Sequence, residues 1–178
     1  LFFMTIGNFE KENFERKLGK QKSFFPDPIM MKHSHKDDRK WHLDIDKFTD
    51  DYNAVHFNSS NDASDELMKE VSHQYIQGLQ WVISYYTTGC PSWKWYYPHQ
   101  YAPMAKPLAS HLSSYKQPRY GVTIPSLPFQ QLLSVLPPKS AHLIPKPLDE
   151  LLTNPKSKMR KFCPEKLVID LSGKRKEW

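Results

Sequence analysis

Prolines are concentrated in one stretch of this 178-residue chain, and they limit what that stretch can form. Eleven of the fifteen prolines lie between Cys90 and Pro147. Because proline fixes φ and lacks an N–H donor, long regular elements are excluded there. We therefore expect an extended, irregular wrap, with short helices only at 129–135 and 148–153, where a proline stands at or near the first turn.

The sequence before the prolines is helical in pattern. From Ser64 to Tyr86, apolar residues recur at three- and four-residue steps, which predicts one long amphipathic helix that Gly89 would end. Gly78 lies inside it and costs about 1 kcal/mol relative to alanine, so we expect another element to approach closely there. The apolar stripe comprises Leu67, Met68, Val71, Tyr75, Leu79, Val82, Ile83 and Tyr86.

The first sixty residues are less regular. Residues 8–20 predict a short amphipathic helix that Asn8 would cap and Gly19 would end, with an apolar stripe of Phe9, Phe14 and Leu18. Residues 20–40 are basic and polar and indicate a loop or disordered arm. Within 41–57, the alternation in "LDID" predicts an edge strand or an extended arm.

The predicted elements together give an α+β fold that is mostly α. One long helix forms the spine, short helices and the proline-rich irregular wrap surround it, and a few short strands complete it, including one at 165–171. We expect residues 1–60 to form an N-terminal helix and a basic, partly flexible arm, and 61–178 to form the main region. The chain begins at Leu1 and stops at Trp178, and both ends indicate a fragment of a longer protein.

Charge, cysteine content, apolar runs and ligand spacing limit the kinds of protein and site that the chain can form. The net charge of +6 mildly favours an anionic partner. Two cysteines make no disulfide framework, which favours a reducing compartment, and no apolar run is long enough to span a membrane. A metal at His33 and His35 lacks further ligands at suitable spacing, and solvent exposure is a commoner role for Asp44 and Asp46 than Mg²⁺ binding, so no metal site is predicted.

The segment "GCPSWKWYYPHQYAP", residues 89–103, is dense in aromatic side chains. In one interpretation its rings are packing anchors for a loop with few aliphatic residues. In the other, an aromatic face beside basic residues stacks on unpaired bases. If the segment is extended, Trp93 and Trp95 lie on one side and Lys94 lies opposite.

The same residues resemble the 5′→3′ exoribonucleases of the Xrn/Rat family. The resemblance is carried by "YIQGLQWVISYYTTGCPSWKWYYPHQYAP" (75–103), "LPFQQLLSVLPPKSAHLIP" (127–145) and "LLTNPKSKMRKFCPEKLVIDLSGKRKEW" (151–178). It covers roughly 61–178, and "KENFERKLG" (11–19) also resembles the helix that opens this region in the family. The chain departs from the family at Gln100, which replaces a usual His, and at Met104, and 104–126 is divergent.

The resemblance implies that this chain is the second conserved region of such an enzyme. The family degrades 5′-monophosphorylated single-stranded RNA processively to nucleoside monophosphates. Its Mg²⁺ and catalytic acidic cluster belong to an N-terminal nuclease domain of the same chain, so no catalytic residue is expected here and the fragment alone should be inactive. The second region walls the entrance and stacks bases, which makes Trp93 the first candidate and Trp95 the second. Tyr97, His99 and Tyr101 complete the expected wall, with the tyrosines serving mainly as packing anchors.

Two further alternatives stay open at this point. A non-catalytic RNA- or protein-binding scaffold would carry the same aromatic segment without a nuclease partner. The family also divides into cytoplasmic and nuclear branches, and "LPFQQLLSVLP" and "GKRKEW" resemble the cytoplasmic branch more closely. The basic run "KSKMRK" (156–161) fits a nuclear signal, but a solvated basic surface is the commoner explanation.

Overall fold

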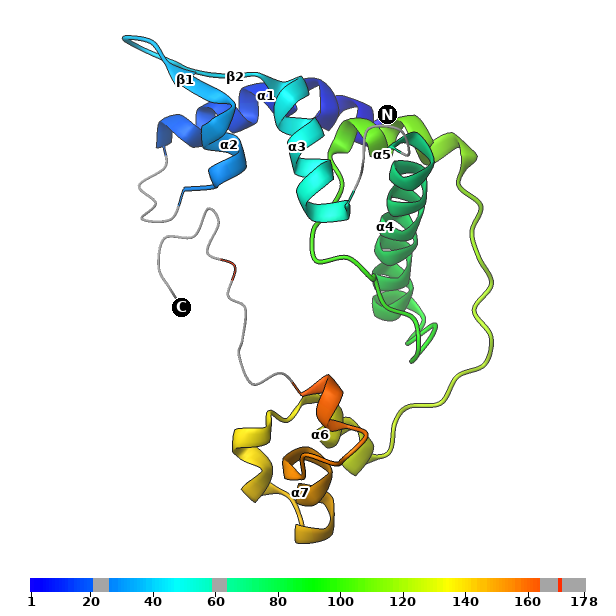
Figure 1. Ribbon diagram of the computed structural model, residues 1–178. Coiled ribbons are helices and arrows are strands. Elements are labelled where there is room, and N and C mark those ends of the chain that lie inside the picture. The colour runs from blue at the N-terminus through cyan, green and yellow to red at the C-terminus, as the bar shows by residue number, and fades with distance from the viewer. Residues whose placement is uncertain (21–25, 59–63, 164–169, 171–178) are drawn as a thin grey trace. The chain divides into compact units, whose positions relative to one another are not determined.

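The computed structural model describes residues 1–20, 26–58, 64–163 and 170, which divide into two compact units (Figure 1). The first unit comprises 1–122 and the second 123–170. Helices dominate both, and the sheet found among the described residues has two short antiparallel strands. The predicted fold class, α+β and mostly α, is confirmed. In this part of the chain, no helix has the length and apolarity needed to cross a membrane.

The elements follow one another along the chain in a simple order. The first unit contains α1 (Phe2–Lys20), α2 (Pro28–Lys32), β1 (Ser34–Lys36), β2 (Trp41–Leu43), α3 (Ile45–Phe57), α4 (Ser64–Thr87), α5 (Ala105–His111) and the 3₁₀ turn η1 (Leu112–Ser114). The second unit contains α6 (Pro128–Val135), the 3₁₀ turn η2 (Pro138–Leu143), α7 (Lys146–Thr153) and the 3₁₀ turn η3 (Arg160–Phe162).

Helix α4 confirms the long helix that the sequence predicts. It ends before Gly89, which has a φ of 103° and whose N–H donates to the carbonyl of Ser84 at 3.1 Å. This left-handed conformation favours glycine, because a side chain there would be strained. The apolar stripe is buried at Met68 and Val71 but becomes exposed towards the C-terminal end of the helix.

Helix α1 is longer than the sequence predicted, and the expected cap at Asn8 is wrong. The helix begins at Phe2 and includes Gly7, where an added Cβ would lie 3.3 Å from the backbone N of Lys106. The close approach of α5 therefore explains why position 7 is glycine, and Gly7 does not break the helix. Phe14 and Leu18 join the core as expected, but Phe9 is exposed.

The expected loop or disordered arm at 20–40 is wrong for the described residues 26–40, and 21–25 lie outside them. Asp27 caps α2 by accepting the N–H groups of Ile29 and Met30 at 2.9 and 3.0 Å. Strand β1 then pairs with β2 in a hairpin, with Ser34 opposite Leu43. Local capping and a hairpin turn can order a polar segment that carries little hydrophobic periodicity.

The extended interpretation of 41–57 is correct only as far as Leu43. Asp44 is the N-cap of α3, and its carboxylate accepts the N–H of Lys47 at 3.3 Å. From Ile45 onward the chain is helical, so the alternation of "LDID" marks a strand end followed by a helix cap.

The first unit has a second buried cluster of Phe57, Met68 and Val71 between α3 and α4, and its larger core joins α1, α2, β2 and α3. The buried residues of the larger core are Leu18, Met30, Leu43, Phe48 and Met104. Glu15 is buried beside them, and its Oε1 accepts the N–H of Leu43 at 3.0 Å while Lys40 lies 3.7 Å from Oε2. A buried carboxylate needs a hydrogen-bond donor and a positive charge nearby. Leu43 and Lys40 supply them, so Glu15 links β2 to α1.

Helix α5 lies in the divergent stretch 104–126, where the sequence predicted only irregular wrap, so that prediction is wrong for 105–111. It packs against both α1 and α4, and the carboxylate of Glu10 accepts the N–H of Ala105 at 2.6 Å. Pro107 falls in its first turn, where the missing N–H costs little. The sequence signal was weak because the helix has only seven residues.

The second unit has a small core of its own, formed by Ala141, Ile144 and Leu152. The short helices predicted at 129–135 and 148–153 are confirmed by α6 and α7, each with a proline in its first turn. The 3₁₀ turn η2 was not predicted. The strand predicted at 165–171 lies outside the described residues.

Replacing Phe48 by alanine should lower the free energy of unfolding by about 3–5 kcal/mol, because the ring is 1% exposed and fills the core. Phe9→Ala is the matched control, since Phe9 is half-exposed on α1, and it should change stability by less than about 0.5 kcal/mol. Chemical denaturation followed by far-ultraviolet circular dichroism measures both. Equal losses for the two variants would contradict the assigned core.

Candidate nucleic-acid interface

The candidate interface is residues 90–103, which we call the strap. After α4 ends, the strap returns towards α5 (Figure 1). Its successive residues meet α4 at Trp81, then Gly78, then Tyr75 and Gln74: the carbonyl of Ser92 makes the first contact and strap side chains make the others. The strap therefore runs antiparallel to α4 and is attached along its length without forming a helix or strand.

Ser92 fixes the start of the strap. It is 5% exposed, and its carbonyl accepts the indole N–H of Trp81 at 3.0 Å. Its Oγ accepts the backbone N–H groups of Lys94 and Trp95 at 3.2 and 3.1 Å. A serine hydroxyl that bonds the next residues in this way makes a tight local turn.

The turn separates the two tryptophans that the sequence placed on one side. The condition for that prediction, an extended segment, does not hold at 92–95. Trp95 is half-buried and lies over Gly78, where an added Cβ would be 3.2 Å from Cη2 of the indole. The edge of Tyr120 contacts the same ring, with centroids 6.3 Å apart. The predicted close approach at Gly78 is confirmed.

Trp93 lies differently from Trp95. Its side chain is 56% exposed, and the exposed Lys94 and the 75% exposed Tyr96 are its neighbours in the chain. This part of the strap therefore exposes two aromatic side chains and one cation to solvent.

Tyr97 and His99 are held against α4. The hydroxyl of Tyr97 donates to the carbonyl of Tyr101 at 2.8 Å, and its ring meets Tyr75 edge-on with centroids 5.5 Å apart. His99 Nε2 lies 2.7 Å from the side-chain oxygen of Gln74. Both side chains thus have defined partners within the protein.

Tyr101 closes the strap against α3. It stacks on His56, with ring centroids 3.6 Å apart and an angle of 25° between the rings. Tyr52 meets it edge-on and donates its hydroxyl to the carbonyl of Ala102 at 2.9 Å. From Trp95 to Tyr101 the odd-numbered residues are half-buried and the even-numbered ones exposed.

Burial also changes the acidity of the anchoring tyrosines. It raises the pKa of Tyr52 to about 12, with the negative charges of Asp27 and Glu10 adding to the effect. Burial likewise raises the pKa of Tyr97 well above its usual value. Because desolvation disfavours the phenolate, these hydroxyls remain hydrogen-bond donors at neutral pH.

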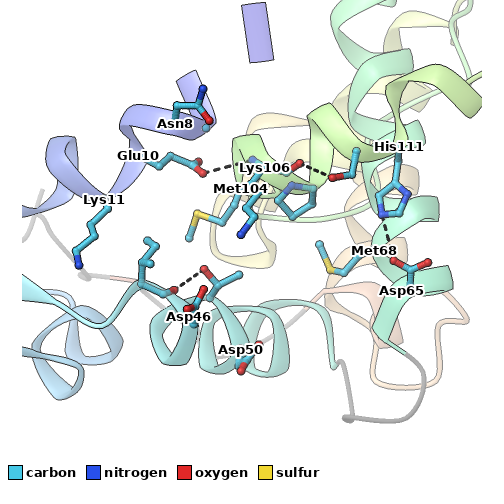
Figure 2. Close-up of a pocket in the computed structure, with 15 residues that line it drawn as sticks. Asn8, Glu10, Lys11, Asp46, Asp50, Asp65, Met68, Met104, Lys106 and His111 are labelled. Atoms are coloured by element: carbon cyan, nitrogen blue, oxygen red, sulfur yellow. Dashed lines mark hydrogen bonds and ion pairs between the residues drawn. The ribbon is translucent and has the colours of Figure 1, made fainter. Parts of the chain in front are cut away.

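A separate hollow of about 460 Å³ lies between α1, α3, α4 and α5 (Figure 2). Several of its polar side chains join these elements: Glu10 bonds the start of α5, and Asp65 lies 3.6 Å from His111. No residue of 90–103 lines it. Across residues 1–20, 26–58, 64–163 and 170, no group of three or more His, Cys, Asp or Glu side chains could hold a metal ion.

The polar residues singled out near the N-terminus have local partners. His33 Nε2 lies 2.7 Å from a carboxylate oxygen of Asp51, and His35 stacks on His42 with centroids 5.2 Å apart. Asp44 caps α3, and Asp46 lines the hollow in Figure 2.

Sequence reasoning did not identify the residues that hold the strap. These are Tyr52, His56, Gln74, Trp81 and Ser92. Trp81 carried the best signal, because a buried indole N–H needs an acceptor. The others come from elements whose positions beside the strap are set only by tertiary packing.

The chain is similar to known 5′→3′ exoribonucleases. The family model for the Xrn1 helical domain matches residues 9–178. 5′-3′ exoribonuclease 1 of Saccharomyces cerevisiae is 41% identical over 115 residues, which is 65% of this chain and 7% of the relative. 5′-3′ exoribonuclease 2 of Gibberella zeae is 44% identical over 116 residues, or 64% of this chain and 11% of the relative.

A third relative, 5′-3′ exoribonuclease 2 of Schizosaccharomyces pombe, is 42% identical over 130 residues, which cover 71% of this chain and 12% of the relative. The chain thus spans about a tenth of the length of the relatives it matches. It is similar to relatives of both names to nearly the same degree.

The raised pKa of Tyr52 predicts a loss of stability at high pH. Between pH 10 and 12 the unfolded chain releases the Tyr52 proton while the folded protein keeps it, so the free energy of unfolding falls as pH rises. Tyr52→Phe should cost about 1 kcal/mol at pH 9, where only the bond to Ala102 is lost. The difference in stability between the two proteins should narrow as pH rises from 9 to 11. Urea unfolding at pH 9, 10 and 11 measures it, and a constant gap would contradict the assigned shift.

Proposed function

Because the chain belongs to the Xrn1 helical domain family, we propose that it forms part of a 5′→3′ exoribonuclease and that its strap walls the entrance to the active site. The exposed indole of Trp93 is the observation that carries this proposal. A flat aromatic face stacks on any unpaired base, which suits an enzyme that degrades RNA of every sequence. The adjacent Lys94 supplies a positive charge for the phosphate backbone.

The proposed substrate is single-stranded RNA with a 5′-monophosphate, degraded processively to nucleoside monophosphates. The family resemblance assigns the catalytic residues and the Mg²⁺ ligands to a nuclease domain N-terminal to this chain, and we propose the same division here. When bound there, Mg²⁺ would lower the pKa of a bound water to generate the nucleophile and would neutralise charge on the phosphate. This chain alone is expected to be inactive.

The C-terminal half of α4 is the proposed docking surface for the nuclease domain. Val82 is 46%, Ile83 64% and Tyr86 82% exposed, and Leu79 and Tyr85 extend the same apolar surface. A contiguous apolar area of this kind typically marks an interface. Its position beside the strap would bring Trp93 close to the domain that holds the metal.

We place the enzyme in the cytoplasm, on the resemblance of 127–137 to the cytoplasmic branch; the alternative is the nucleus. A fluorescent fusion of the full-length protein should give a cytoplasmic signal. Accumulation in the nucleus would favour the other branch and give 156–161 a role as a targeting signal.

Trp93→Ala in the full-length enzyme should slow degradation of 5′-phosphorylated single-stranded RNA by about tenfold or more, because one base-stacking contact is lost. Trp93→Phe should retain most of the rate, since a ring remains. The measurement is the single-turnover rate, with circular dichroism to confirm that the variants fold. Tyr96→Ala is the control for another exposed ring of the strap. Parental rates in both Trp93→Ala and Trp95→Ala would refute stacking and leave packing as the role of both rings.

Ile83→Asp in the full-length enzyme should weaken docking of the nuclease domain, because the aspartate would be desolvated at that interface. We expect faster limited proteolysis between the two regions and at least a tenfold lower activity. Lys69→Asp, on the N-terminal half of α4, is the control for a charge change on the same helix. If Ile83→Asp behaves like this control, the proposed docking surface is wrong.

A further inference from the structure

The contacts around the strap assign different tasks to its two tryptophans. We infer that Ser92, Gly78 and Trp95 are positioning residues that hold the Trp93 indole in a fixed, solvent-facing orientation for base stacking. The inference rests on the proposed function, because it assumes that a base stacks on Trp93.

The turn at Ser92 fixes the backbone on both sides of Trp93. One buried hydroxyl accepts two backbone N–H groups, from Lys94 and Trp95, and so sets the direction of the chain on both sides of Trp93. The carbonyl of the same serine accepts the Trp81 indole N–H, which fixes the turn to α4. Removing the hydroxyl would leave two N–H groups without this acceptor and free the backbone around Trp93.

The Trp95 indole packs against α4 at Gly78, which we call its seat. A Cβ added at Gly78 would lie 3.2 Å from Cη2 and 3.8 Å from Cζ3 of the indole, so a side chain there would crowd the ring. Glycine at position 78 lowers the stability of α4. In return, it lets the Trp95 ring pack closely against the helix. The Trp95 ring is half-buried and contacts both Gly78 and Tyr120, which makes it a poorer stacking surface than the more exposed Trp93.

Fixing the Trp93 ring in advance lowers the entropic cost of stacking on a base. A side chain that must be ordered when its ligand binds loses conformational entropy at that moment. An indole on a backbone that is already fixed avoids much of this loss, so its stacking is more favourable. The turn and the seat thus act on RNA binding through Trp93 and do not touch the base themselves.

The test compares an intact 5′-monophosphorylated single-stranded RNA with three abasic RNAs of the same sequence. In these three, an abasic site replaces the first, the second or the third nucleotide. The ratio of kcat/KM for the intact RNA to that for each abasic RNA measures base stacking. A general loss of stability lowers both values together and leaves the ratio unchanged.

In the full-length enzyme, Trp93→Ala should lower this ratio by roughly fivefold or more. Ser92→Ala and Gly78→Ala should each lower it by about threefold, while Ser92→Thr, which keeps the hydroxyl, should retain it. Ser110→Ala is the matched control, since that hydroxyl donates only to Lys106 within α5.

The outcomes separate the two proposals. If Trp93→Ala lowers the ratio but Ser92→Ala and Gly78→Ala do not, the positioning inference is wrong and the proposed function stands. If Trp93→Ala leaves the ratio at its parental value, base stacking on Trp93 is refuted and the inference falls with it. Should Ser92→Ala fail to fold, Gly78→Ala decides, because it changes only the seat of Trp95.

Discussion

The attachment of the strap to α4 is the constraint on which the rest of the first unit depends. A segment with prolines at 91, 98 and 103 cannot join a helix or a central strand, so its backbone groups need other partners. Side chains supply several of them: Ser92 accepts two strap N–H groups, Trp81 donates to Ser92, and Tyr52 donates to Ala102. An irregular segment thereby acquires a defined shape.

This attachment divides the aromatic residues into two sets. Trp95, Tyr97, His99 and Tyr101 are half-buried and contact α3, α4 or Tyr120, and Trp93 and Tyr96 are more exposed. The packing and stacking interpretations of the sequence are therefore not exclusive, because neighbouring rings can serve each purpose. The dense aromatic composition reflects both the area needed to anchor an irregular segment and the proposed contact with RNA.

Sequence reasoning was most successful where periodicity extended over several turns. Helix α4 was predicted to within one residue at its C-terminal end, and α6 and α7 followed from prolines at first turns. It was least successful where short local interactions decide the structure. The Asp27 cap, the hairpin of β1 and β2, and the Asp44 cap all order polar residues that gave little hydrophobic signal. The start of α1 was misjudged because Gly7 was not recognised as a contact with α5.

By itself, the sequence determined that the chain has a long spine helix, that the region after Gly89 is irregular, and that its aromatic motif belongs to an exoribonuclease family. These follow from periodicity, from the chemistry of proline and from an ungapped motif, all of which are local along the chain. Only the tertiary structure decided which tryptophan faces solvent. That choice depends on Ser92, Gly78 and Tyr120, and the distances between their atoms and the strap are fixed by the packing of separate elements.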